Sequence, residues 1–82
     1  METIVLEHEF ERAFDLERYR EAQARNQWCL REYGVEHVRS YLTPDGLRMI
    51  CIFRAPDAEA VRKLSLQLGY SYDQVWRATV ID

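Results

Sequence analysis

The stretch from Val35 to Phe53 carries the residue types in this chain that are best suited to chemistry. His37, Arg39 and Tyr41 stand at alternate positions before a Thr-Pro-Asp-Gly turn. Cys51 follows after the turn. Histidine is the usual acid–base group near neutral pH, and imidazole and thiolate groups also bind nickel, zinc and copper. The stretch therefore indicates either an acid–base site or a metal site.

The alternation of side chains predicts that this stretch is a hairpin, with strands over 35–42 and 47–54 and a turn over 43–46. If Thr43 pairs with Leu47, one face carries six mixed side chains: His37, Arg39, Tyr41, Met49, Cys51 and Phe53. The other face carries Val38, Ser40, Leu42, Ile50 and Ile52. We expect this more aliphatic face to meet the helices and the mixed face to point away from them. A slip of one residue would exchange the two faces.

The N-terminal segment adds carboxylates to the mixed face. Alternation over 3–11 predicts a strand with Ile4 and Leu6 on the helix side and Val5, Glu7 and Glu9 on the other side. Metal ligands are then expected from four residues: His37, Glu7, His8 and Cys51. The sequence has no close His-x-His or Cys-x-x-Cys pair, so spacing alone does not select a metal.

The same face allows a second reading, in which a cavity holds a small molecule. Its ligand-binding residues would be Glu7, His37, Arg39, Tyr41 and Cys51. In a minor enzyme of the dimeric α+β barrel type, His37 would be the acid–base group, Arg39 an anion clamp and Tyr41 a hydrogen-bond donor. A third reading is an interaction module without a ligand, where Arg39 and Glu7 form an exposed ion pair worth at most about 1 kcal/mol. We expect a non-enzymatic role.

The order of predicted elements defines the fold class. Asp15 is placed to cap a helix that runs to about residue 33 and stops at Gly34. Asp57 caps a second helix that ends at Gly69, and a closing strand follows over 73–81. The order is βαββαβ, which predicts an α+β, ferredoxin-like fold. Its four-stranded antiparallel sheet would have the first and third strands at the centre and two helices on one face.

Length and composition set the wider expectations. The 82 residues suit a single domain over 1–82, and one core of this size is marginal, so we expect a homodimer that covers the helix-free sheet face. The net charge of −3 argues against a nucleic-acid partner. No apolar run approaches the roughly 20 residues of a membrane span, and no secretory signal is visible. The two distant cysteines indicate reduced thiols and a cytoplasmic location.

Three phrases of the sequence resemble a known family. They are "ETIVLEHEF", "VEHVRSYLTPDGLRMICIFRAPDAEAVRK" and "LGYSYDQVWRATVID". Together they are similar to a family of small bacterial nickel-binding proteins, otherwise known as an uncharacterised domain family. The resemblance implies a ferredoxin-like fold, a homodimer and nickel as the metal. We therefore expect a small homodimeric protein that binds a divalent metal such as nickel.

The resemblance can be followed residue by residue. Glu7, Ser40, Tyr41 and Cys51 match the family pattern, whereas relatives carry tryptophan and histidine where this chain has His37 and Arg39. They carry arginine where this chain has His8. The resemblance thus implies that Arg39 replaces a histidine ligand and that His37 stands two residues from the familiar position.

Overall fold

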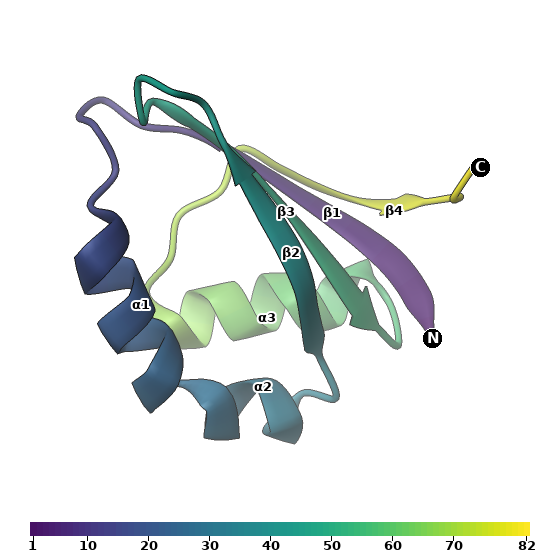
Figure 1. Ribbon diagram of the computed structural model, residues 1–82. Helices are drawn as coiled ribbons and strands as arrows, with labels where there is room; N and C mark the ends of the chain where they lie inside the picture. Colours follow the sequence, from purple (N-terminus) through teal and green to yellow (C-terminus); the bar gives the residue numbers. More distant parts are fainter.

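Four strands and three helices build the protein, for which a computed structural model describes residues 1–82. Their order is β1 (Glu2–Glu9), α1 (Leu16–Arg25), α2 (Gln27–Glu32), β2 (Glu36–Leu42), β3 (Arg48–Ala55), α3 (Ala58–Leu68) and β4 (Gln74–Ala78). The strands form one antiparallel sheet in the order β2-β3-β1-β4, with β1 and β3 at the centre as predicted. All three helices lie on the same side of the sheet (Figure 1). The α+β, ferredoxin-like prediction is confirmed.

The first predicted helix is two helices, because the chain leaves helical geometry at Asn26. This residue has φ −100° and ψ 6° and separates α1 from α2. Asparagine readily bonds outside a helix, and the Asn26 amide donates to the Tyr70 hydroxyl over 3.2 Å. The prediction of one helix from 15 to 33 was therefore wrong. No helix is long and apolar enough to cross a membrane.

The core lies between the sheet, α2 and α3, and α1 contributes little to it. Ten buried side chains form the core cluster: Ile4, Leu6, Cys29, Val35, Met49, Cys51, Ala55, Val61, Leu64 and Val75. No residue of α1 is buried, and Leu16 at its start is 44% exposed. The helix α1 therefore covers the sheet without burying any of its own side chains against it.

The hairpin has a different register from the predicted one. Thr43 pairs with Arg48 instead of Leu47, through a 2.9 Å bond from the Thr43 amide to the Arg48 carbonyl. The Asp45 carboxylate holds this wider turn by accepting from the Thr43 hydroxyl at 2.7 Å and the Leu47 amide at 3.0 Å. The register then shifts between His37 and Arg39. The extra residue, Val38, is a β-bulge.

The bulge divides the six side chains that were predicted to share one face. His37 pairs with Phe53, whereas Arg39 pairs with Ile52 and Tyr41 with Ile50. Met49 and Cys51 belong to the helix-covered core. Consequently His37 faces the helices, and Arg39 and Tyr41 lie on the helix-free face. The prediction that the most aliphatic face meets the helices was wrong for β3.

The loop before α1 is fastened to the hairpin turn. The Phe10 amide donates to the Leu47 carbonyl at 2.7 Å, and the Phe14 amide donates to the Gly46 carbonyl at 2.8 Å. Gly46 has φ +74°, and a Cβ atom there would lie 3.1 Å from the Phe14 nitrogen. Glycine is thus needed for both conformation and space. The contact fixes where Phe10 and Phe14 stand beneath α1.

Candidate functional site

A continuous series of hydrogen bonds runs from α1 through β2 to β3. Gln23 Nε2 lies 3.1 Å from His37 Nδ1, and His37 Nε2 lies 2.8 Å from Ser40 Oγ. Ser40 Oγ donates to Cys51 Sγ at 3.0 Å. Because the serine proton points to sulfur, the Ser40 oxygen accepts from His37 Nε2–H, and Nδ1 accepts from Gln23. One neutral tautomer of His37 satisfies the whole series.

The bulge in β2 is what brings His37 and Ser40 to the same face. Residues three apart point to opposite faces of a regular strand, and one extra residue restores them to the same face. Ser40 lies directly opposite Cys51 in the ladder, and His37 lies opposite Phe53 with ring centroids 5.5 Å apart. An irregularity in one strand thus assembles the series of polar groups.

Burial keeps this group of side chains uncharged. Burial lowers the pKa of His37 below its usual value. Burial raises the pKa of the Cys51 thiol, and the hydrogen bond from Ser40 partly opposes that rise. The pKa of Tyr19 is also raised, first by burial and then by the neighbouring Cys51. At neutral pH the imidazole is therefore free to act as a ligand, whereas the thiol must first lose its proton.

Three of the predicted site residues lie on the other side of the sheet. Glu7 Oε2 accepts from Trp76 Nε1 at 2.9 Å, and Glu7 Oε1 lies 3.9 Å from an Arg48 nitrogen. Arg39 and Tyr41 share this helix-free face, where Tyr41 is 56% exposed. Since His37 is on the opposite face, the acid–base, anion-clamp and donor arrangement predicted for an enzyme is not assembled.

His8 lies on the helix side but does not join His37. Its ring meets Phe10 edge-on with centroids 4.6 Å apart. Its Nδ1 atom is buried without a hydrogen-bond partner, and the closest carboxylate oxygen, Asp73 Oδ2, is 3.7 Å away. Nowhere in the chain do three His, Cys, Asp or Glu side chains converge as a metal cluster would. Of the four predicted ligands, only His37 and Cys51 are linked, through Ser40.

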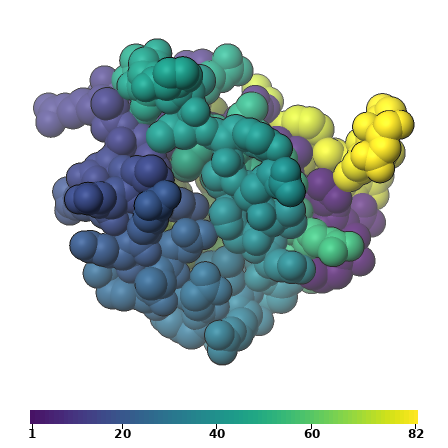
Figure 2. Space-filling view, viewed as in Figure 1, coloured from purple at the N-terminus to yellow at the C-terminus, as the bar shows by residue number.

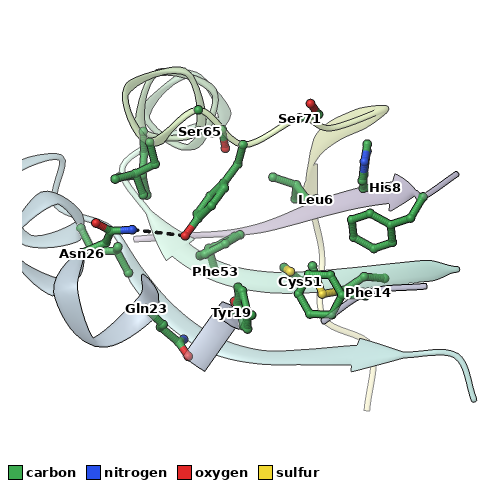
Figure 3. A pocket seen from close by; sticks show the side chains of 17 residues that line it. Leu6, His8, Phe14, Tyr19, Gln23, Asn26, Cys51, Phe53, Ser65 and Ser71 are labelled. Carbon is green, nitrogen blue, oxygen red and sulfur yellow. Dashed lines mark hydrogen bonds between the residues drawn. The ribbon is translucent and has the colours of Figure 1, made fainter. Parts of the chain in front are cut away.

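A pocket of about 330 Å³ lies between the sheet, α1 and α3. It replaces the cavity that was predicted on the helix-free face. Figure 3 shows Cys51, Phe53, Tyr19 and Gln23 among the side chains around it. Nothing in the sequence patterns predicted that Gln23, Phe10 and Phe14 would line a pocket. The available signal for Phe10 and Phe14 was two large aromatic residues in an otherwise polar loop.

The His37–Cys51 pair fits nickel in the type of its donors and less well in their number. Nitrogen and sulfur ligands suit borderline metals such as nickel and zinc. Both donor atoms approach the Ser40 hydroxyl oxygen, at 2.8 and 3.0 Å. One chain supplies two such donors, so other ligands would have to complete the coordination. The helix-free face offers carboxylate from Glu7 but no imidazole or thiol.

A match to a family sequence profile assigns the chain to a family. The profile of the "Nickel responsive protein SCO4226-like" family matches residues 5–77, which includes every helix and nearly all of the sheet. The chain belongs to this family. No functionally curated protein matches the chain. Among SCO4226-like proteins of known structure, the crystal structure of SCO4226 from Streptomyces coelicolor A3(2) superposes with a TM-score of 0.83. It covers 98% of this chain and 99% of its own at 15% identity, which establishes the shared fold.

Proposed function

We propose that this SCO4226-like protein is a non-enzymatic binder of a divalent metal, nickel first, and that His37 and Cys51 are its ligands. The observation that carries the proposal is the approach of an imidazole nitrogen and a thiol sulfur to the same hydroxyl, Ser40 Oγ, within 3.0 Å. Membership of a family named for its nickel response supports the choice of metal. Nickel supplies no chemistry here beyond its binding.

The protonation of the two ligands determines when they can bind. The lowered pKa of His37 keeps its imidazole neutral, as a ligand must be. The raised pKa of Cys51 means that its proton has to leave, so affinity should increase with pH. Binding through Nε2 would require the tautomer of His37 that carries its proton on Nδ1. The Gln23 amide oxygen, after a flip of the amide, would accept a hydrogen bond from that Nδ1–H and hold the ring in place.

Arg39, which stands where relatives carry a histidine, does not argue against a metal site at His37 and Cys51. The bulge places Arg39 opposite Ile52 on the helix-free face, away from the His37–Cys51 pair. The residue at 39 therefore does not subtract a ligand from this site. His37 and Cys51 supply only two ligands. We therefore expect water or other small ligands at the remaining coordination positions, and we expect the metal to exchange readily.

We also propose that a second copy of the chain covers the helix-free face. Trp76 and Tyr41 stand there 44% and 56% exposed, beside Ile50 and Ile52. Ile50 and Ile52 lie on the central strand β3, between Tyr41 on edge strand β2 and Trp76 on edge strand β4. An exposed face with this many aromatic and aliphatic side chains is typical of a protein interface. The two free cysteines suit the cytoplasm as the compartment.

Calorimetric titration of nickel into the metal-free protein tests the metal proposal. We expect saturable binding that is weakened at least tenfold in both His37→Ala and Cys51→Ser. Cys29→Ser is the matched control, because Cys29 is the other buried thiol and has no part in the series. The absence of saturable heat with the unaltered chain, or equal losses in Cys29→Ser and Cys51→Ser, would contradict the proposal.

The second candidate function is the binding of a small molecule, and the pocket beneath α1 favours it. The pocket shares Cys51 and Gln23 with the proposed metal site, so small-molecule binding is tested on the metal-free protein, separately from nickel binding.

A further inference from the structure

The pocket beneath α1 has the dimensions of a small-molecule site. It occupies about 330 Å³, close to the lower limit of typical ligand pockets, and 11 of its 17 lining residues are hydrophobic. It exists because no residue of α1 is buried against the sheet. In Figure 2 the surface is hollowed between the blue atoms of α1 and the teal atoms of β2. The pocket touches Gln23 and Cys51 and extends from there toward Phe10 and Tyr70.

The charges of the pocket restrict what it can hold. Its lining includes no Arg, Lys, Asp or Glu side chain. A charged ligand would lose its hydration without gaining an ionic partner, which is costly in an apolar enclosure. The lining therefore favours an uncharged ligand over a charged one.

The shape of the lining indicates a flat occupant. His8, Phe10, Phe14 and Tyr19 contact one another in series, with ring centroids 4.6, 5.0 and 5.1 Å apart. All four rings line the pocket. Aromatic rings pack well by edge or offset contact with another ring. A planar aromatic molecule is the best complement to this wall.

Two polar features mark the ends of the pocket. At one end the buried His8 Nδ1 has no hydrogen-bond partner, and Asp73 Oδ2 is too distant at 3.7 Å. Because Nδ1 is covered by protein, a ligand's polar group would bind the imidazole through its other ring nitrogen, Nε2, which also makes no hydrogen bond within the chain. Figure 3 shows His8 pointing from the sheet toward the loop that carries Ser71. At the other end, the hydrogen bond from Asn26 to Tyr70 connects the α1–α2 junction to the loop after α3.

We propose that this pocket binds an uncharged planar aromatic molecule with one hydroxyl or ring N–H, which forms a hydrogen bond with His8. The aromatic wall holds the ring, and the imidazole selects the polar group. The proposal goes beyond metal binding, and because Cys51 and Gln23 belong to both sites, it is tested in the absence of metal.

Three naphthalene compounds provide the test on the metal-free, full-length protein. 2-Naphthol is uncharged at neutral pH and carries one hydroxyl, naphthalene lacks the polar group, and 2-naphthoate is charged. We expect saturable binding of 2-naphthol by fluorescence titration, about fivefold weaker binding of naphthalene, and no saturable binding of 2-naphthoate. In His8→Phe, 2-naphthol and naphthalene should bind alike, since Phe keeps the ring and removes the hydrogen bond.

A matched pair of variants on α3 locates the binding. Leu68 lines the pocket, whereas Leu66 is 74% exposed on the same helix. Leu68→Trp should fill the pocket and abolish 2-naphthol binding, and Leu66→Trp should leave it unchanged. Thermal unfolding of both variants checks that they are folded. The proposal is overturned if the unaltered chain does not bind 2-naphthol saturably, if 2-naphthoate binds as tightly, or if folded Leu68→Trp binds like Leu66→Trp.

Discussion

Ser40 and Cys51 face each other across β2 and β3, and the serine hydroxyl donates to the cysteine sulfur at 3.0 Å. The same hydroxyl oxygen accepts from His37 Nε2 at 2.8 Å. One small side chain thus connects the two residues that we propose as metal ligands. Its position depends on the bulge at Val38, and so the site depends on a feature of backbone geometry.

The first prediction concerns Ser40→Ala. Removing the hydroxyl takes away the hydrogen bond that opposes the rise of the Cys51 pKa, so the thiol should titrate at higher pH than in the unaltered chain. The free energy of unfolding should fall by about 1–2 kcal/mol, because two part-buried groups lose a partner. Thiolate absorbance against pH, with Ser71→Ala as control, measures the shift. A lower thiol pKa in Ser40→Ala would contradict the directed series of hydrogen bonds.

The second prediction concerns stability and pH. The pKa of His37 is lower in the folded chain than in the unfolded one, so the unfolded state binds more protons as the pH falls below about 6.5. The stabilisation that depends on neutral His37 is present above that pH and is lost toward the folded-state pKa. Urea unfolding between pH 5 and pH 7 should therefore show a steeper rise in stability for the unaltered chain than for His37→Gln. Parallel curves would show that His37 has no lowered pKa.

The third prediction separates steric crowding from backbone strain at two glycines. Gly46 and Gly69 share φ +74°, but a Cβ atom at Gly46 would lie 3.1 Å from the Phe14 nitrogen, and one at Gly69 would meet nothing within 4 Å. Gly46→Ala should lower the free energy of unfolding by about 1 kcal/mol more than Gly69→Ala does. Urea unfolding of both variants measures the difference. Equal losses of unfolding free energy in the two variants would mean that the backbone around Phe14 moves aside for the new Cβ atom at little cost.

The fourth prediction tests the proposed homodimer. Sedimentation at micromolar concentration should report a dimer for the unaltered chain and a monomer for Trp76→Glu, since the new carboxylate would be buried without a partner in the interface. Trp28→Glu is the control: Trp28 is 56% exposed on α2, on the helix side of the sheet. A monomeric unaltered chain, or a monomer produced equally by Trp28→Glu, would contradict the proposed interface.

The fold was predictable from the sequence because its signals are repeated over many residues. The alternation that predicted a strand over 3–11, and the Asp and Gly residues at helix ends, are local patterns that tertiary contacts reinforced, although β1 ends at Glu9. Asp15 and Asp57 both cap helices as predicted, with side chains that accept from the Arg18 and Ala60 amides. The order of elements then left few topologies to consider.

The candidate site was less predictable because it depends on single-residue events. The bulge at Val38 leaves no mark in composition, yet it moves His37 to the helix side relative to Arg39 and Tyr41. The aliphatic character of Ile50 and Ile52 also misled the choice of face, because Met49 and Cys51 fill the core as well as isoleucine would. Glu7 and His37 were thus expected together and lie on opposite faces.

X-ray absorption at the nickel edge tests the central claim most directly. The nickel-loaded unaltered chain should show one sulfur and at least one imidazole among the metal's neighbours. Cys51→Ser should lose the sulfur signal, and Cys29→Ser should keep it. A nickel environment of oxygen atoms alone in the unaltered chain, or a sulfur signal that survives in Cys51→Ser, would contradict the assignment of His37 and Cys51 as the metal ligands.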